Sequence, residues 1–406
     1  MDRIGKERYQ SNEKVKIAAK LFLIISIFII ISLFITNGLY KTYAETPNSS
    51  MIVIEANSLK KLGGYNEDVK LPMASTTKIV TAIVAINNAD LDSVVTVTKE
   101  SVGVEGSSIY LKEGEKMTLR DMLYGLMLRS GNDSATAIAL HVGKNMDNFV
   151  SMMNDYASGL GLQNTHFANP HGLHDDNHYT SAYDLAVMTA KAYESEEFKA
   201  IVSCKKYDVK ASENCEARTF YNKNKILSLY QGGNGVKTGF TKKAGRCLVS
   251  AAERDGMQLI CVALNRGDMW GESMGAMDKA FAEYEALKFA EKDTALFTLP
   301  SGKRIGVNKD AIYPVKKYCD ANFSWTFIPE QGLSKKINIG DKVGIMQVYE
   351  NNQLLFSADL YSMDNINTDA ELYYLTHYEG QEKIEYDGKT EQVFGFLRSG
   401  FPSRCG

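Results

Sequence analysis

Residues 235–265 read GVKTGFTKKAGRCLVSAAERDGMQLICVALN and hold three apolar runs that are separated by short polar turns. The runs at 235–240, 247–254 and 258–265 are rich in Val, Leu, Ile and Ala, which predicts three strands. The second and third runs flank Asp255-Gly256, a dipeptide that is typical of two-residue turns between antiparallel strands. This stretch therefore predicts part of an antiparallel sheet.

The turn also sets the register of the hairpin. A two-residue turn pairs Arg254 with Met257, and the same pairing places Cys247 opposite Leu264. Side chains alternate between the two faces of a strand, so Cys247 and Cys261 are expected on opposite faces of the sheet. We therefore expect no disulfide between these two cysteines.

Helical periodicity lies on both sides of these strands in the sequence. A strand-like run covers 51–55, well before the hairpin. Apolar residues with helical spacing cover 75–86, 119–129, 134–142, 146–160, 181–192 and 274–290. The order of strand, helices, strands and helix predicts an α/β (α+β) domain, in which a sheet has helices on its faces and a helical insertion.

The composition changes near residue 293. Beyond it, short alternating runs lie at 295–299, 304–307, 335–339, 342–349 and 354–361. Turn residues separate these runs, which predicts a small all-β domain. We therefore divide the chain into an N-terminal segment at 1–44, a first domain at 45–292, a β-rich domain at 293–380 and a polar tail at 381–406.

The N-terminal segment is basic at first and then apolar. Residues 21–35 are apolar apart from two serines, and the preceding residues hold Arg3, Lys6, Arg8, Lys14, Lys16 and Lys20. This order is typical of a signal peptide or a retained signal anchor, and both alternatives stay open. The positive end should stay in the cytoplasm, so the rest is expected outside, on the outer face of the cytoplasmic membrane or secreted.

Composition excludes several classes of protein. The 406 residues are 44% apolar and 23% charged, with a formal net charge of −3. These values fit a globular chain of two or three domains and exclude disorder, collagen and coiled coil. The near-neutral charge argues against nucleic acid as a partner, since a nucleic-acid-binding protein would carry a basic face.

Export permits disulfides among the six cysteines. None of them has C-x-x-C spacing, which disfavours a zinc ribbon or a thiol redox motif. Cys204 and Cys215 could close a short loop, but plain buried thiols are the favoured interpretation for all six. They are Cys204, Cys215, Cys247, Cys261, Cys319 and Cys405.

Three short clusters carry chemically useful side chains, and the first is Ser75-Thr76-Thr77-Lys78 at the start of an apolar helix. The hydroxyl of Ser75 and the amine of Lys78 share one helical face about a turn apart, within hydrogen-bond reach. A desolvated lysine can lose its proton and act as a base toward a serine nucleophile. The alternative is that Ser75 only caps the helix.

The second cluster is Ser130-Gly131-Asn132 between two helical segments, and the third is Lys237-Thr238-Gly239 on the first strand of the opening stretch. A turn at Gly131 would point both polar side chains inward, although a plain helix end explains the same residues. Glycines at 232, 233, 235 and 239 mark a strand that a ligand or another stretch of backbone approaches closely. The alternative for Lys237 is an exposed strand lysine.

In this order, Ser-x-x-Lys, Ser-x-Asn and Lys-Thr-Gly are the motifs of serine enzymes that open β-lactams or D-Ala-D-Ala bonds. The sequence resembles a low-molecular-mass penicillin-binding protein, a serine-type D-alanyl-D-alanine carboxypeptidase. The resemblance extends over segments 74–79, 126–133, 167–173, 235–245 and 340–344. It implies a penicillin-binding/β-lactamase-like domain, with an antiparallel sheet flanked by helices and a helical subdomain, plus a small all-β C-terminal domain.

The resemblance also implies catalytic roles. Ser75 would attack the carbonyl of the penultimate D-Ala of a peptidoglycan pentapeptide, and Lys78 would take its proton. Ser130, together with Lys237, would pass a proton to the leaving D-Ala. The implied product of the first step is an acyl-enzyme, and penicillins would acylate the same serine.

The resemblance further implies how the substrate is held. Backbone N–H groups of Ser75 and Phe240 would form the oxyanion hole, which is usually the largest electrostatic contribution. The chain departs from the family at Arg246, where members usually carry an aromatic residue. The implied substrate-binding residues are Asn132, Lys237, Thr238, Gly239 and Phe240.

We expect no metal and no cofactor. His171, His174 and His178 have a spacing that could hold a metal ion, but their loop resembles a metal-independent segment of the family. The expected partners are the peptidoglycan pentapeptide, β-lactam inhibitors and the cytoplasmic membrane.

Three other functions are compatible with parts of the sequence. A class A β-lactamase needs a deacylating Glu after the second motif, and residues 164–180 contain only Asp175 and Asp176 as acids. A non-catalytic peptidoglycan-binding protein is disfavoured by the intact set of three motifs. Endopeptidase cleavage of peptidoglycan cross-links stays open, because its acylation step is the same.

Overall fold

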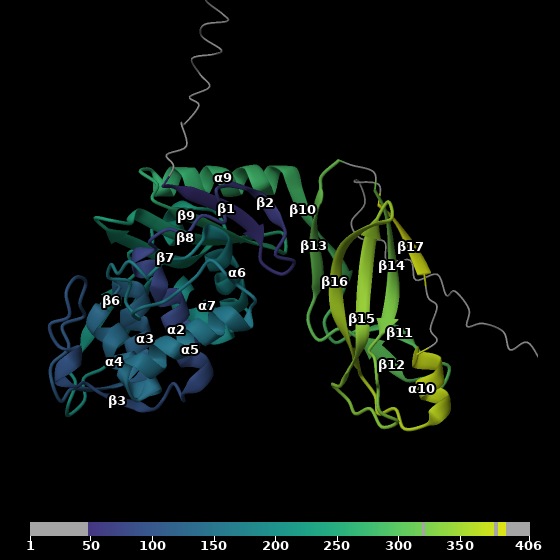
Figure 1. The fold of residues 1–406 in the computed structure, drawn as a ribbon, viewed down its shortest axis with the longest axis horizontal. Coiled ribbons are helices and arrows are strands. Elements are labelled where there is room, and N and C mark those ends of the chain that lie inside the picture. Colours follow the sequence, from purple (N-terminus) through teal and green to yellow (C-terminus); the bar gives the residue numbers. More distant parts are fainter. Residues whose placement is uncertain (1–47, 319–320, 377–380, 387–406) are drawn as a thin grey trace, which may run out of the picture. The chain divides into compact units, whose positions relative to one another are not determined.

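The computed structural model of the chain describes residues 48–318, 321–376 and 381–386, and Figure 1 shows their fold. The predicted signal or anchor at 1–44 lies outside these residues, as do Cys319 and Cys405. Within the described ranges, no helix is both long enough and apolar enough to cross a membrane.

A five-stranded antiparallel sheet lies at the centre of the first domain, in the order β2-β1-β9-β8-β7. Alternate side chains of β9 belong to different cores: Val262 packs on one face of the sheet and Cys261 on the other. Burial on both faces explains the nearly continuous apolar runs. The strands are β1 (Ser50–Glu55), β2 (Lys61–Tyr65), β7 (Gly233–Thr241), β8 (Gly245–Arg254) and β9 (Met257–Leu264).

The register of the β8–β9 hairpin is the predicted one. Arg254 pairs with Met257, and Cys247 and Cys261 belong to core clusters on opposite faces of the sheet. Both are free thiols, as are Cys204 and Cys215. Burial raises the pKa of the Cys247 thiol to about 12, so it stays protonated and unreactive.

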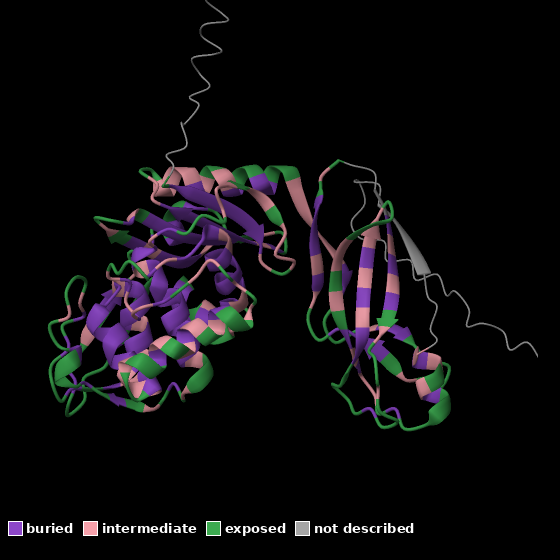
Figure 2. Cartoon of the chain, in the orientation of Figure 1, coloured by how far each residue is buried: buried purple, intermediate pink, exposed green. Residues whose placement is uncertain are grey.

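Helices cover both faces of this sheet (Figure 1). Helix α9 (Met269–Glu283) packs on β8, β9 and β1 on one face, while α6 (Ala182–Ala192) packs on β9 and β1 from the other. The helical insertion surrounds α2 (Lys78–Asn88), which is buried along its first eight residues (Figure 2). Its other helices are α3 (Leu119–Tyr124), the π turn η3 (Gly125–Arg129), α4 (Asn132–Gly143), α5 (Met146–Gly159) and α7 (Glu196–Ser203).

Short elements complete this part of the chain. They are two strand pairs and three short helical turns. The pairs are β3 (Val94–Thr96) with β4 (Lys116–Thr118), and β5 (Lys206–Val209) with β6 (Arg218–Tyr221). The turns are η1 (Ala74–Thr77), η2 (Lys99–Ser101) and α8 (Ile226–Leu229).

The β-rich region has its own core. A six-stranded antiparallel sheet runs in the order β11-β12-β16-β15-β14-β17, and Phe323, Trp325 and Phe327 of β14 enter the core at alternate positions. Strand β10 (Tyr284–Ala290) pairs separately with β13 (Ala311–Lys316). The sheet contains β11 (Ala295–Thr298), β12 (Arg304–Gly306), β14 (Ala321–Pro329), β15 (Lys342–Glu350), β16 (Gln353–Ser362) and β17 (Gln381–Tyr386). Helix α10 (Asp369–Thr376) lies between β16 and β17 in the chain and places Leu375 in this core.

Two local predictions were wrong. The run 274–290 is not one helix, because α9 ends at Glu283 and Tyr284 is already extended, where β10 begins to pair with β13. Pairing with a distant strand overrides the helical propensity of this run. The run 335–339 is not a strand but makes a single bridge, Ile337 to Ile366. Apart from these two, strand β17 lies within residues 381–406, the segment expected as a polar tail.

Candidate active site

The first motif lies on a tight turn that leads into α2. We call η1 (Ala74–Thr77) the nucleophile turn. Ala74 is left-handed, with φ of +49°, which is uncommon for a residue with a Cβ. Ser75 does not cap a helix, since η1 and α2 have Met73 and Thr77 as N-cap residues and neither uses a side chain. The Oγ of Ser75 instead accepts a hydrogen bond from Lys78 Nζ at 3.0 Å.

Lys78 is fully buried beneath the nucleophile turn. Its Nζ also donates to Asn132 Oδ1 at 2.7 Å and to His171 O at 2.5 Å. Burial, and secondarily the nearby charge of Lys237, lowers the pKa of Lys78 well below its ordinary value. Donation to all three oxygens uses the three N–H groups of the ammonium form. In the neutral form two N–H groups remain for Asn132 and His171, and the lone pair faces Ser75 Oγ at 3.0 Å, where it can accept the hydroxyl proton.

The second motif lies at the junction of η3 and α4. Ser130, and not Gly131, takes the left-handed conformation that ends η3, with φ of +66°. Asn132 then opens α4, with its backbone N–H bound to Ser107 O and its Nδ2 bound to Glu105 O. These contacts fix the amide, so that its oxygen faces the amine of Lys78.

Asp133 organises the loop that holds Asn132, a role that no motif of the sequence indicated. It is buried and accepts hydrogen bonds from the backbone N–H groups of Ile109 and Leu111 and from the hydroxyl of Ser108. A carboxylate that accepts several N–H groups can replace the missing hydration of a buried charge. The only signal in the sequence was its place directly after the second motif.

The third motif lies on β7, at one edge of the sheet. Lys237 is 2% exposed, so the alternative of an exposed strand lysine is wrong. Its Nζ donates to Thr238 O at 3.0 Å, and burial, with a further contribution from Lys223, lowers its pKa to about 7. Gly239 lets the strand approach the nucleophile turn, because a Cβ there would lie 3.0 Å from Ser75 N.

The structure joins some of the predicted site residues directly. Ser75, Lys78 and Asn132 form one hydrogen-bonded group, and Gly239 packs against it. Among the described residues, no hydrogen bond links the Ser130 hydroxyl or the Lys237 amine to this group. Phe240 follows at the end of the strand, where it is 65% exposed and pairs with Arg246 of β8.

Lys223 is a third amine near the site. Its charge lowers the pKa of both Lys237 and Lys78. It lies in the polar run Asn222-Lys223-Asn224, which the sequence presents as an ordinary turn, so no motif indicated it.

The loop at 164–180, which we call the histidine loop, packs against the nucleophile turn and α2. Besides the bond from Lys78 to His171 O, Thr81 donates to Pro170 O at 2.6 Å. The three imidazoles have separate partners: Leu173 N donates to His171 Nδ1, Ala168 N donates to His178 Nδ1, and His174 lies 3.4 Å from Asp176. In the part of the chain that the structure describes, no three potential metal ligands gather.

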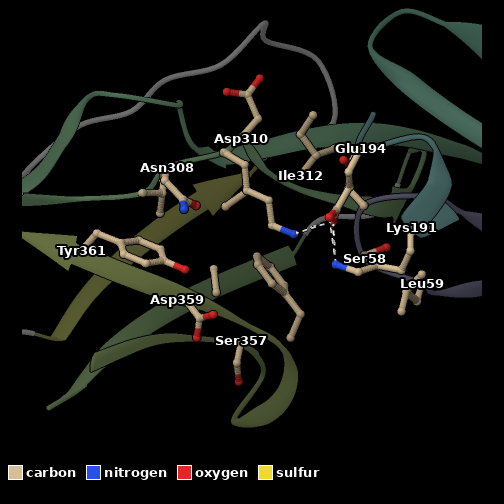
Figure 3. A pocket seen from close by; sticks show the side chains of 16 residues that line it. Ser58, Leu59, Lys191, Glu194, Asn308, Asp310, Ile312, Ser357, Asp359 and Tyr361 are labelled. Carbon is tan, nitrogen blue, oxygen red and sulfur yellow. Dashed lines mark hydrogen bonds and ion pairs between the residues drawn. The ribbon is translucent and has the colours of Figure 1, made fainter. Parts of the chain in front are cut away.

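A separate pocket of about 500 Å³ contains none of the motif residues (Figure 3). Glu194 accepts ionic hydrogen bonds there from Lys191 at 2.9 Å and Lys309 at 3.2 Å. The two acids Asp310 and Asp359 of its lining are also paired, with Lys288 at 2.9 Å and with Lys342 at 2.8 Å.

Comparisons with known proteins identify a family for this chain. A family model described as D-alanyl-D-alanine carboxypeptidase matches residues 40–267. The D-alanyl-D-alanine carboxypeptidase DacF of Bacillus subtilis is 28% identical over 333 residues, which cover 78% of this chain and 85% of that protein. A Streptomyces D-alanyl-D-alanine carboxypeptidase is 36% identical over 213 residues, covering 48% of this chain and 73% of its own.

Solved structures agree with these matches. Penicillin binding protein 5 from Haemophilus influenzae superposes with a TM-score of 0.61 at 25% identity, over 79% of this chain and 97% of that one. The DacD carboxypeptidase of Francisella tularensis has the same fold, with a TM-score of 0.59 at 23% identity over 82% and 98% of the two chains. The chain therefore belongs to the D-alanyl-D-alanine carboxypeptidase family of serine peptidases, with the penicillin-binding-protein fold and a separate β-rich region.

Proposed function

We propose that this D-alanyl-D-alanine carboxypeptidase acts through Ser75, which forms an acyl-enzyme with the peptidoglycan pentapeptide and with penicillins. One observation carries the assignment. The Nζ of Lys78 is buried, has a strongly lowered pKa and lies 3.0 Å from Ser75 Oγ. A serine hydroxyl is a weak nucleophile unless a base removes its proton, and this amine is placed to do so.

In the acylation step, Ser75 Oγ bonds to the carbonyl carbon of the penultimate D-Ala while its proton passes to Lys78. The bond from that carbon to the nitrogen of the terminal D-Ala then breaks. The nitrogen must gain a proton to leave as an amine, and we assign its delivery to Ser130, assisted by Lys237. Water later hydrolyses the ester, so the overall reaction consumes one water and releases one D-Ala.

The substrate is proposed to lie along β7. Because β7 is the edge strand of its sheet, its outer backbone groups can pair with an extended peptide. Thr238, Gly239 and Phe240 provide that edge, and the amide of Asn132 binds the peptide from the opposite side. The N–H groups of Ser75 and Phe240 are the proposed donors to the oxyanion.

A penicillin adduct on Ser75 should be long-lived. The histidine loop contacts the first-motif helix through the carbonyl groups of Pro170 and His171. The two acids of this loop are exposed and have partners within the loop. Asp175 accepts a hydrogen bond from Asn177 N, and Asp176 lies next to His174. A β-lactamase would need a carboxylate that activates water beside the ester.

Two measurements test the assignment. Purified protein should be labelled covalently by a fluorescent penicillin and should release D-Ala from a pentapeptide that ends in D-Ala-D-Ala. Ser75→Ala should lose both activities while keeping its melting temperature. Unchanged D-Ala release by that variant, or rapid release of free penicilloate by the wild type, would contradict the proposal. Incubation with a cross-linked dimeric muropeptide measures the endopeptidase alternative directly.

We also propose that the chain works outside the cytoplasmic membrane. A basic stretch followed by apolar residues 21–35 supports export, either with cleavage or with retention as an anchor. Cell fractionation followed by N-terminal sequencing distinguishes the two outcomes. Recovery of the chain in the cytoplasm with its first residues intact would contradict export.

A further inference from the structure

A chain of hydrogen bonds runs from the histidine loop to the backbone of the nucleophile turn. The backbone N–H of Ala168 donates to Nδ1 of His178 at 3.0 Å, so Nδ1 is an acceptor and the ring proton is on Nε2. That Nε2 lies 2.7 Å from Thr77 Oγ1, which in turn lies 2.7 Å from the carbonyl oxygen of Ala74. The Thr77 hydroxyl therefore accepts from His178 and donates to Ala74.

The direction of these bonds is fixed by the environment. His178 is 3% exposed and Thr77 is fully buried, so water does not compete for either group. Burial, followed by the neighbouring His171, lowers the pKa of His178 to about 3, so the ring is neutral at physiological pH. In a neutral imidazole whose Nδ1 accepts a hydrogen bond, the single ring proton is on Nε2, which can therefore only donate.

The end of the chain is the peptide unit that precedes the nucleophile. The carbonyl of Ala74 and the N–H of Ser75 belong to one planar trans peptide, so holding the carbonyl also holds the N–H in the opposite direction. The nitrogen of Ser75 faces Gly239 of β7. Ala74 is in a left-handed conformation that costs free energy unless its surroundings maintain it.

Gly172 of the histidine loop packs on the same carbonyl. A Cβ at this position would lie 2.0 Å from Ala74 O and 2.9 Å from Thr77 Oγ1. The backbone of the loop therefore closes directly over the hydrogen bond between Thr77 and Ala74. Two independent contacts from one loop thus hold a single peptide group.

We propose that His178 and Thr77 are positioning residues, which hold the Ala74–Ser75 peptide so that the Ser75 N–H points at the substrate oxyanion. The inference rests on the proposed function, in which this N–H is an oxyanion donor. Both side chains are buried, so in this role they act through the peptide group and not on the substrate. Their hydrogen bonds also polarise the peptide group and make its N–H a stronger donor.

The first test compares two substitutions of Thr77. Thr77→Val keeps the β-branched shape but has no hydroxyl, whereas Thr77→Ser keeps the hydroxyl. We expect Thr77→Val to lower the rate constant for acylation by a penicillin about 10- to 100-fold, which is less than the loss of a whole oxyanion donor. Thr77→Ser should stay within about threefold of wild type, and KM for the peptide should hardly change in either variant, because only the transition state carries the oxyanion.

The second test separates positioning from loop stability. In His178→Gln the carboxamide reaches as far as Nε2 and can donate to Thr77, whereas in His178→Asn it reaches only Nδ1 and can accept from Ala168. Positioning predicts that Gln retains more acylation activity than Asn, even where Asn gives the higher melting temperature. A purely structural histidine predicts the reverse order of activity.

The outcomes are distinct. Wild-type acylation by Thr77→Val, or better rescue by Asn than by Gln, overturns this inference while leaving the proposed function intact. Failure of the wild type itself to acylate overturns the proposed function. Circular dichroism and melting temperatures for all four variants identify any protein that has lost its fold. If this happens at one position, the pair of variants at the other position decides the question.

Discussion

The Nζ of Lys78 lies 2.7 Å from Oδ1 of Asn132. This bond joins the first motif to the second and crosses from α2 to α4. Asn132 presents a neutral oxygen, which orients the amine without the charge of a carboxylate. An opposite charge at that distance would favour the protonated amine, so an amide is the side chain that positions Lys78 and leaves its pKa low.

Replacement of Asn132 by Asp tests this relationship. The substitution keeps the shape of the side chain and adds a negative charge next to Nζ, so the pKa of Lys78 should rise. In a plot of the acylation rate against pH, the rise of the rate on the acid side, its acid limb, should therefore move to higher pH. Acylation by a penicillin at pH 7 should fall by about tenfold for each unit by which this pKa rises. Stopped-flow rates measured from pH 5 to 10 should recover at the alkaline end. If the acylation rate of Asn132→Asp falls by the same factor at every pH, Asn132 acts in substrate binding alone.

Substitution of Lys223 should also shift the pH dependence of the acylation rate. The positive charge of Lys223 helps to lower the pKa of Lys237 and of Lys78, so Lys223→Gln should raise both and shift the acid limb upward. The shift should be smaller than that of Asn132→Asp, because Lys223 is exposed and its field is screened. In the wild type, 1 M salt should move the limb in the same direction. Lys225→Gln is the matched control, because Lys225 is another exposed lysine two residues on. It should leave the pH dependence of acylation unchanged.

The β8–β9 hairpin and the first motif show which features of the structure could be predicted from the sequence. The register of β8–β9 could be predicted, because a two-residue turn and the alternation of side chains leave one pairing that suits two buried faces. The contact of Ser75 with Lys78 follows from their spacing on one helical turn. Both predictions depend on residues that are close in the sequence.

The missed features depend on distant residues. Thr77 and His178 are far apart in the chain, and only the folded histidine loop brings them together. The end of α9 at Glu283 is set by pairing of β10 with β13, which no local pattern encodes. Asp133 shows its role only through the backbone N–H groups of a preceding loop. Tertiary contacts decide such features, whereas local propensity is a weak guide to them.

Burial of Lys237 should make stability depend on pH. Its pKa of about 7 in the folded chain lies below the roughly 10.4 of an unfolded lysine, so the unfolded state binds more protons between these values. The free energy of unfolding should therefore rise with pH across that window, by up to about 1.4 kcal/mol per pH unit from this site. Urea unfolding of wild type and Lys237→Met from pH 6 to 10 isolates the contribution. A difference between the two proteins that does not change with pH would contradict the lowered pKa.

Substitution of Gly172 should be destabilising for two reasons, the close contact of a new Cβ with Ala74 and the strain of a positive φ. Gly172 has φ of +88°, and a Cβ would lie 2.0 Å from Ala74 O. Gly161, after α5, has a similar φ of +73° and no atom within 4 Å of the Cβ position. Gly161→Ala should thus cost only the left-handed strain of about 1 kcal/mol, whereas Gly172→Ala should cost about 1–3 kcal/mol more through overpacking.

The two alanine variants also differ in their expected chemistry. Because Gly172→Ala pushes on the carbonyl that precedes Ser75, it should slow acylation by penicillin, whereas Gly161→Ala should acylate at the wild-type rate. Thermal unfolding and acylation rates measured on the same samples separate the two effects. Equal destabilisation by both substitutions would mean that the loop can shift away from Ala74, and the nucleophile turn would then be held by its own residues alone.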